Sequence, residues 1–149
     1  MYTIRKAGKS DRESYAQMRH ELWPDCSEER HKLEIDLIMS SAGFVLLAEL
    51  PDTKIVGFAE LSIRSDHVEG TRESPVPYLE GWYVKSDYQG LGIGKALINA
   101  AEVFALEMGF SELASDAELD NTSAIAIHKK IGFREVDRTV HFVKSLKER

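Results

Sequence analysis

A glycine-rich turn between two regular elements constrains this fold more than any other feature of the sequence. An apolar, strand-like run precedes the turn and a long helical pattern follows it. Glycines at such a junction let a ligand approach the backbone, and the exposed N–H groups at a helix start bind anions such as a pyrophosphate. A tight strand-to-helix connection without a ligand would show similar glycines. The residues of the turn are Gln89, Gly90, Leu91, Gly92, Ile93, Gly94 and Lys95.

Two better-known glycine motifs do not match this turn. Its glycines stand at positions 90, 92 and 94, which is not the G-x-G-x-x-G spacing of dinucleotide-binding folds. No Gly-Lys-Ser/Thr follows, so the turn is not a Walker A phosphate loop either. The sequence therefore indicates an anion-binding turn of another kind.

The rest of the chain alternates strand-like runs with amphipathic helical patterns. Ser10 and Glu13 have the spacing of a capping box, which starts a first helix that ends near Trp23. Ser27 can cap a second helix that runs to about Met39. Gly81 interrupts a strand, which suggests a bulge or the close approach of another group. We expect strands at 3–6, 44–50, 55–64, 78–84 and 113–115, a polar loop at 65–77, helices at 90–108 and 121–131, and a final β pair at Val136 and Val140–Val143.

This order of elements predicts an α/β (α+β) fold, a mixed sheet with about four helices on its faces. The 149 residues match the length of one average domain, so we expect a single domain over 1–149. Hydrophobic residues make up 43 % of the chain, yet no apolar run approaches the ~20 residues of a membrane span. The first ten residues lack the apolar core of a secretory signal. Composition thus favours a cytoplasmic protein.

Charge and cysteine content exclude further classes. The net charge is −6, and no basic patch stands out, so a nucleic-acid partner is disfavoured. An acidic surface attracts cations, although solubility alone would also explain it. The single cysteine, Cys26, rules out an intrachain disulfide and a cysteine-based zinc cage. We expect no metal site.

Two segments together resemble the GNAT (GCN5-related N-acetyltransferase) superfamily. The first is the Gln-x-x-Gly-x-Gly turn that begins at Gln89, which resembles the acetyl-CoA pyrophosphate loop. The second joins Asn121-Thr122-Ser123-Ala124 to Lys129-Lys130-Ile131-Gly132-Phe133. The resemblance implies a mixed central sheet that splays apart beside the cofactor.

A closer resemblance, to the aminoglycoside 6′-N-acetyltransferases, also runs from end to end. It implies transfer of an acetyl group from acetyl-CoA to the 6′-amine of a polycationic antibiotic, with no metal. It rests on Leu22-Trp23-Pro24, Ile63-Arg64-Ser65-Asp66, Ser74-Pro75-Val76, Leu79-Glu80-Gly81 and Ala114-Ser115-Asp116.

The same resemblance implies where the cofactor lies. The pyrophosphate would bind the backbone of Gln89–Lys95, and Asn121 would hydrogen-bond the pantetheine arm. That arm would run along Trp82, Tyr83 and Val84 like an added strand. A bulge at Gly81 would leave backbone groups there for the thioester carbonyl. Asn121 could instead serve only as a helix N-cap.

For the acceptor, the resemblance points to two carboxylates. Glu80 stands beside the expected splay, and Asp116 follows a sheet strand, where ligands commonly bind. Either could act as the base that removes a proton from the acceptor ammonium. Trp23 could form an aromatic wall against ammonium groups. His67 and Asp137 take positions where the family often has tyrosine and glutamate, so they are weaker candidates for substrate contact.

His128 stands where much of the superfamily has a tyrosine in the last helix. A histidine can donate a proton near neutral pH, so His128 is a candidate general acid, although it could merely pack on an apolar stripe. The missing tyrosine leaves open a non-catalytic acyl-CoA-binding domain. Transfer to another small amine, such as a polyamine, is also open. The family resemblance further implies a homodimer built through the C-terminal strands.

Overall fold

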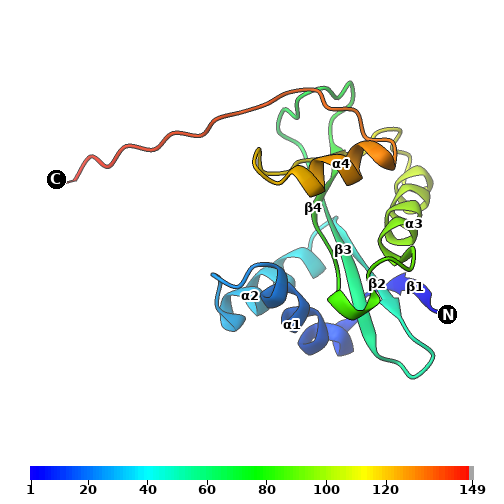
Figure 1. Ribbon diagram of the computed structural model, residues 1–149. Coiled ribbons are helices and arrows are strands. Elements are labelled where there is room, and N and C mark those ends of the chain that lie inside the picture. The colour runs from blue at the N-terminus through cyan, green and yellow to red at the C-terminus, as the bar shows by residue number, and fades with distance from the viewer. Residues whose placement is uncertain (148–149) are drawn as a thin grey trace. The chain divides into compact units, whose positions relative to one another are not determined.

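The computed structural model describes residues 1–147 and divides them into two compact units (Figure 1). The first unit spans Met1–Asp116 and the second begins at Ala117. The two are described separately below. In the part of the chain that the structure describes, no helix is long and apolar enough to cross a lipid bilayer.

The first unit is built on a five-stranded sheet whose strands follow one another in chain order. Neighbouring strands are antiparallel from β1 to β4, whereas β4 and β5 are parallel. The mixed sheet that the sequence predicts is confirmed. The strands are β1 (Thr3–Lys6), β2 (Phe44–Glu49), β3 (Ile55–Arg64), β4 (Val76–Val84) and β5 (Ala114–Ser115).

Three helices cover the sheet of the first unit. They are α1 (Arg12–Leu22), α2 (Glu28–Met39) and α3 (Ile93–Glu107). Figure 1 shows α1 and α2 on one face and α3 on the other. Strand β2 serves both faces because its side chains alternate: Leu47 joins the core under α1 and α2, whereas the Phe44 ring lies 5.9 Å from that of Phe104 on α3.

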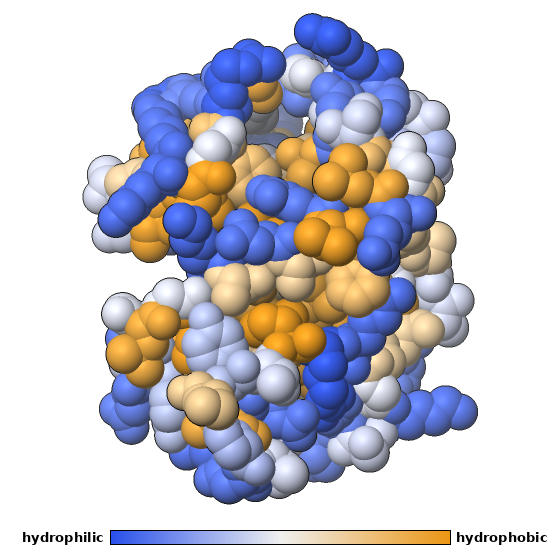
Figure 2. Space-filling view, turned by 90° about the vertical axis from the view of Figure 1, so that its right-hand side faces the viewer, coloured by the Kyte–Doolittle hydropathy of each residue, from blue (hydrophilic) through white to orange (hydrophobic). Residues whose placement is uncertain are grey.

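Helix α3 buries a stripe on the sheet and leaves its other side exposed. Leu97 and Ala101 are fully buried, whereas Val103 and Leu106 are exposed. Figure 2 views the side on which α3 lies in Figure 1 and shows orange hydrophobic residues among blue hydrophilic ones. Gly109 has φ of 93°, a left-handed conformation that favours glycine and ends the helix just after Met108.

The helix starts agree with the sequence at one cap and differ at another. Ser27 Oγ accepts the Arg30 N–H at 3.1 Å, so the predicted cap of α2 is confirmed. The predicted capping box at Ser10 is wrong, because the N-cap of α1 is Asp11. The Asp11 carboxylate is buried and accepts both Nη groups of Arg5 at 2.8 Å and the Gly8 N–H at 2.7 Å. A 3₁₀ turn, η1 (Lys9–Asp11), therefore precedes the helix.

The second unit holds one helix, α4 (Thr122–Lys130), followed by residues 134–147 without helix or strand. The β pair expected at Val136 and Val140–Val143 is therefore wrong. A strand satisfies its backbone groups only by pairing, and within the described residues nothing pairs with this segment. Its apolar side chains stay exposed, with Phe142 at 91 % and Val143 at 98 %.

Candidate functional site

Strand β4 carries a bulge at Glu80. Glu60 of β3 lies opposite Gly81, and the next residue, Leu61, lies opposite Leu79, so Glu80 is the extra residue. The ladder between β4 and β5 covers Tyr78 and Leu79 and ends just before this bulge. The bulge near Gly81 that the sequence predicts is confirmed, and the sheet changes its pairing at this point.

Gly81 also allows a side chain of α1 to approach the strand. A Cβ at position 81 would lie 2.6 Å from Cη2 of Trp23, which is closer than real contacts allow. Trp23 is the C-cap of α1, and its ring lies 6.4 Å from that of Phe58 on β3. The absence of a side chain at Gly81 thus brings the end of α1 against the bulge, as the sequence suggested.

A pocket of about 610 Å³ opens beside the bulge. Its volume falls in the range of small-molecule sites. Helices α1 and α2 form one side and strands β3 and β4 the other. The residues that line it are Arg19, Trp23, Cys26, His31, Glu34, Leu37, Ile38, Ser41, Glu60, Ser62 and Glu80.

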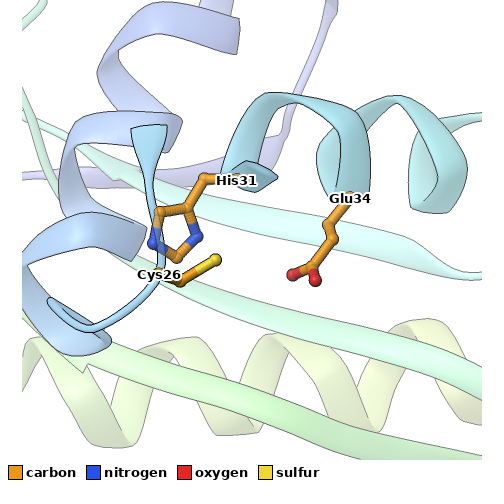
Figure 3. A group of neighbouring side chains, drawn as sticks. All are labelled: Cys26, His31 and Glu34. Carbon is orange, nitrogen blue, oxygen red and sulfur yellow. The ribbon is translucent and has the colours of Figure 1, made fainter. Parts of the chain in front are cut away.

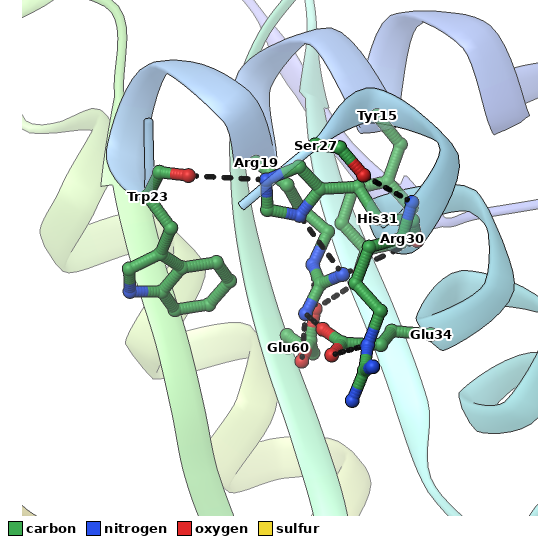
Figure 4. A network of polar contacts seen from close by, with 8 residues as sticks. All are labelled: Tyr15, Arg19, Trp23, Ser27, Arg30, His31, Glu34 and Glu60. Carbon is green, nitrogen blue, oxygen red and sulfur yellow. Dashed lines mark hydrogen bonds and ion pairs between the residues drawn. The ribbon is translucent and has the colours of Figure 1, made fainter. Parts of the chain in front are cut away.

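One wall of the pocket contains a buried ion pair between Arg19 and Glu60, which we call the inner pair (Figure 4). Arg19 Nε lies 2.9 Å from Glu60 Oε1, and the Tyr15 hydroxyl donates to the same carboxylate. Arg19 is only 4 % exposed and Glu60 6 %. Burial raises the pKa of Glu60 above its ordinary value, although Arg19 and Tyr15 act against this shift.

The Arg19 guanidinium also joins the inner pair to α2. Its Nη1 lies 3.3 Å from His31 Nδ1, and its Nη2 donates to Glu34 Oε1 at 2.9 Å. His31 Nε2 lies 3.1 Å from the carbonyl oxygen of Trp23. His31 is therefore held through both ring nitrogens, and it fixes the end of α1 against the start of α2.

Cys26, His31 and Glu34 come close enough to hold a metal ion, since their ligand atoms lie within 4.8 Å of one another (Figure 3). Thiolate, imidazole and carboxylate are ligands that zinc accepts. However, the Arg19 guanidinium already contacts both His31 and Glu34, and Glu34 also accepts from Arg30 at 3.0 Å. A positive side chain thus takes the place that a metal ion would need, and the cluster does not fit a metal.

A second pair, Arg64 and Glu80, lies on the same face of the sheet, and we call it the outer pair. Arg64 Nε and Nη2 donate to the two Glu80 oxygens at 2.9 and 2.8 Å, and the Ser62 hydroxyl donates to Oε2. The Arg64 guanidinium carbon lies 3.5 Å from the ring centre of Tyr78, whose hydroxyl donates to Asp116. The pair is half-exposed, at 41 % for the Arg64 side chain and 27 % for that of Glu80.

Tyr78 connects the outer pair to Asp116, which directly follows β5. Burial, and then the hydrogen bond to Asp116, raise the pKa of Tyr78. The phenol is therefore protonated at neutral pH, and its O–H donates a hydrogen bond to the Asp116 carboxylate. Ser62, Arg64, Tyr78, Glu80 and Asp116 form one continuous polar row, which we call the outer row.

The glycine turn follows β4, as the sequence predicts, but α3 begins at Ile93 rather than at Gly90, so the last three residues of the turn form the start of the helix. Gly90 and Gly92 have φ of 81° and 85°, a left-handed conformation that favours glycine. A Cβ at either position would meet nothing within 4 Å, so the backbone faces open space. Gln89 Nε2 donates to the Val84 carbonyl at 2.9 Å and ties the turn to the end of β4. The first N–H groups of α3 have no partner within the helix, which suits an anion.

Three candidate residues belong to the second unit. Asn121 is the N-cap of α4, because its Oδ1 accepts the Ala124 N–H at 3.0 Å. His128 Nδ1 lies 2.7 Å from the Ala124 carbonyl, so this nitrogen carries a hydrogen. Asp137 lies in the segment without regular structure and contacts Thr139. Their roles stay predictions.

Comparison with known proteins identifies the family. The family model described as "Acetyltransferase (GNAT) family" matches residues 11–133. This chain belongs to that family.

Two curated relatives of this GNAT chain have the same name. An aminoglycoside N(6′)-acetyltransferase type 1 from Stenotrophomonas maltophilia is 43 % identical over 140 residues, which cover 94 % of this chain and 91 % of the relative. Another of the same name, from Klebsiella aerogenes, is 40 % identical over 147 residues and covers 96 % of each chain.

Solved structures agree with this GNAT fold. The aminoglycoside 6′-N-acetyltransferase from Acinetobacter baumannii superposes with a TM-score of 0.88 at 34 % identity and covers 98 % of this chain and 99 % of the other. The enzyme AAC(6′)-Iy, in complex with the bisubstrate analogue CoA-S-monomethyl-acetylneamine, superposes with a TM-score of 0.90 at 32 % identity. That match covers 97 % of this chain and 99 % of the other.

The GNAT fold brings some of the predicted site residues together. Trp23 and Glu80 line one pocket, and Asp116 joins Glu80 through Tyr78 and Arg64. His67 lies elsewhere, in the connection between β3 and β4, where its side chain is 78 % exposed and contacts Glu69.

Four polar residues of the inner and outer pairs had no role predicted from the sequence. Glu60, Ser62 and Arg64 alternate along one face of β3, and Arg19 reaches them from α1. The signal was present as polar residues at every second position of an otherwise apolar strand. Only the fold shows which of these side chains pair with one another.

Proposed function

We propose that this protein is an aminoglycoside 6′-N-acetyltransferase that uses acetyl-CoA as its cosubstrate. The observation that carries the proposal is a carboxylate-lined pocket that meets the β4 bulge on the strand leading into the glycine turn. The curated relatives and the structure bound to a CoA–acetylneamine conjugate support it.

The cofactor end of the site fits a pyrophosphate and an extended arm. Gln89–Lys95 would hold the pyrophosphate on backbone N–H groups, in a turn where the Cβ positions of Gly90 and Gly92 face open space. The arm would follow Trp82–Val84, beyond the point where the β4–β5 ladder ends. Asn121 uses its oxygen as an N-cap, so its side-chain NH₂ would be the group that reaches the arm. When bound, acetyl-CoA supplies an activated acetyl thioester.

The acceptor end offers negative charge and an aromatic wall. Glu80 and Asp116 would attract ammonium groups, and the face of Trp23 would contact them. His67 and Asp137 are weaker substrate contacts, as the resemblance implies. The acidic surface of the whole chain, with its net charge of −6, favours the approach of a polycation.

The hydrogen bonds of the two carboxylates differ, and this favours Asp116 as the base. Both Glu80 oxygens accept from Arg64, and Ser62 adds a third donor. Asp116 accepts a hydrogen bond from the neutral Tyr78 hydroxyl, which orients the carboxylate without neutralising it. His128 would act as general acid through Nε2, because Nδ1 donates to the Ala124 carbonyl.

The assembly we propose is a homodimer formed through the C-terminal segment. Exposed apolar side chains in residues 134–147 are of the kind that a partner strand would cover. They include Val140, Phe142 and Val143. We expect sedimentation at micromolar concentration to give the dimer mass, and a single monomeric species would contradict the proposal.

Because the reaction consumes acetyl-CoA, we place the protein in the cytoplasm.

The test of the proposed function is release of free CoA thiol from acetyl-CoA with four acceptors. Kanamycin and tobramycin carry a 6′-amine, paromomycin carries a 6′-hydroxyl, and spermidine is a simple polyamine. We expect release with the first two only. Release with spermidine alone would show that the acceptor is a polyamine rather than an aminoglycoside. No CoA release with any of the four acceptors, together with measurable acetyl-CoA binding, would indicate a non-catalytic domain.

The assignment of the base has its own test. Asp116→Asn should lower kcat by about 10²-fold or more with a modest change in acceptor binding. Asp36→Asn is the matched control, since Asp36 is an exposed aspartate paired with Arg12. Unchanged kcat in Asp116→Asn would remove Asp116 from the mechanism.

A further inference from the structure

Acetyl transfer to an amine carries an electrostatic conflict. The acceptor arrives as an ammonium ion and must lose a proton before its nitrogen can attack the thioester. Carboxylates that attract the ammonium also raise its pKa and so hold the proton on it. A pocket with several uncompensated carboxylates would therefore bind the acceptor well and react slowly.

Arg64 is placed to offset this effect. Its guanidinium occupies both oxygens of Glu80 at 2.9 and 2.8 Å, and it stacks on Tyr78, the residue that donates to Asp116. An arginine stays charged at every pH at which a protein works. The fixed positive charge of Arg64 thus pairs directly with Glu80 and acts on Asp116 only through space.

Three groups act on Arg64: Glu80 and Tyr78 on β4, and Asp116, which directly follows β5. Glu60 on β3 interacts with Glu80. Within the described residues, Arg64 is the cation that contacts Glu80, since the Arg19 guanidinium is engaged by Glu60 and Glu34. Removing Arg64 would therefore leave Glu80 with a neutral donor, Ser62, as its contact.

We propose that Arg64 is a positioning residue whose fixed charge offsets Glu80, so that the pocket binds the acceptor ammonium and still lets it lose its proton. The inference rests on the proposed function. It predicts that binding and turnover move in opposite senses when the charge is removed. Affinity for the acceptor rises because Glu80 is released, and turnover falls because the bound amine keeps its proton.

The experiment measures kcat and acceptor KM between pH 6 and pH 9 for the wild-type chain, Arg64→Gln and Arg64→Lys. For Arg64→Gln we expect KM for kanamycin to fall about threefold at pH 7 and kcat to fall by a similar factor. The acid limb of the kcat profile should move up by about 0.5 to 1 pH unit, because half-exposed charges are screened. Arg64→Lys should restore most of the wild-type pH profile, since lysine keeps the positive charge and loses only the two-pronged hydrogen bonding to Glu80.

Arg12→Gln is the matched control. Arg12 donates to both oxygens of Asp36 at 2.9 and 2.8 Å, through Nε and Nη2 as Arg64 does to Glu80. This pair lies on an exposed surface of α1 and α2. It should leave both kinetic constants and the pH profile unchanged.

Two results would overturn the inference separately from the proposed function. An active wild type whose pH profile is unmoved in Arg64→Gln would show that the charge does not act on the amine. A rise in KM in that variant would show that Arg64 merely shapes the pocket. A wild-type chain that transfers no acetyl group to kanamycin would overturn the proposed function and the inference together.

Discussion

The inner and outer pairs are built from the same groups and differ in burial. Each is a glutamate held by an arginine and by one hydroxyl, from Tyr15 in the inner pair and from Ser62 in the outer pair. Glu60 and Arg19 are almost fully buried, whereas the side chains of Glu80 and Arg64 are 27 % and 41 % exposed. The chemical groups of a pair therefore do not by themselves assign it to stability or to function.

Burial decides whether a pair serves stability or function, because it determines whether water or a ligand can replace one of its partners. The inner pair lies between α1, α2 and β3, so its partners cannot be replaced by water or by a ligand without opening the core. The outer pair faces solvent, so a substrate ammonium can compete with Arg64 for Glu80. Stability should therefore depend on the inner pair and acceptor chemistry on the outer pair.

The largest expected effect comes from breaking each pair on its arginine side. Arg19→Gln leaves the Glu60 carboxylate buried without its cation and should lower the free energy of unfolding by about 3–5 kcal/mol. Arg64→Gln should lower it by about 1 kcal/mol or less, because the pair is half-exposed. Guanidinium denaturation measures both, and equal losses would contradict the comparison.

Next come the glutamates, replaced by their neutral isosteres. Glu80→Gln should lower kcat/KM for kanamycin about tenfold or more, which corresponds to ~1.4 kcal/mol of transition-state stabilisation, with little change in melting temperature. Glu60→Gln should change kcat/KM less, because Arg19 and Tyr15 cover the Glu60 carboxylate. The opposite ranking in steady-state kinetics would assign the inner pair to the reaction.

The third prediction concerns pH and the inner pair. Burial raises the pKa of Glu60 above its ordinary value of 4.5, so between 4.5 and the raised value the folded protein binds more protons than the unfolded one. This difference makes the contribution of Glu60 to stability fall as pH rises through that window. Melting curves should therefore show the advantage of the wild type over Glu60→Gln shrinking above pH 4.5. A difference that stays constant with pH would contradict the buried position of the charge.

The smallest effects should come from the hydroxyl donors. Tyr15→Phe removes the buried donor to Glu60 and should cost about 1–2 kcal/mol, whereas Ser62→Ala at the half-exposed Glu80 should cost about 0.5 kcal/mol. Urea denaturation of the two variants gives the comparison directly. A larger loss for Ser62→Ala would show that exposure does not rank these two regions.

Much of the fold was predictable because it depends on local patterns. The end of α1 and the extent of α2 follow from helical periodicity and from the Ser27 cap. Gly81 marked both the bulge and the approach of Trp23. The Ser10 capping box was wrong because Asp11 takes the N-cap position, where Arg5 and the Gly8 N–H hold its carboxylate. A pattern within four residues cannot show such partners.

The C-terminal segment illustrates a different limit. Residues 134–147 contain the apolar and β-branched side chains that are typical of strands, yet no strand forms there. A strand needs a pairing partner, and local sequence does not supply one. For the candidate site, Glu80 and Asp116 were found through a resemblance. Their partners Arg64 and Tyr78 were not, because side-chain pairing depends on the register of β3 against β4.

The sequence by itself determined the order of strands and helices in the first unit, the glycine turn before α3 and the residue types of an acidic acceptor site. Those properties follow from periodicity, from backbone freedom at glycine and from composition, all of which act within a few residues. Only the tertiary structure decided which carboxylates carry a compensating charge. Arg19 and Glu60 are 41 positions apart and Arg64 and Glu80 are 16 apart. The inner pair forms because α1 packs against β3, and the outer pair forms because β3 pairs with β4. Burial makes the first pair structural, whereas exposure leaves the second open to a substrate.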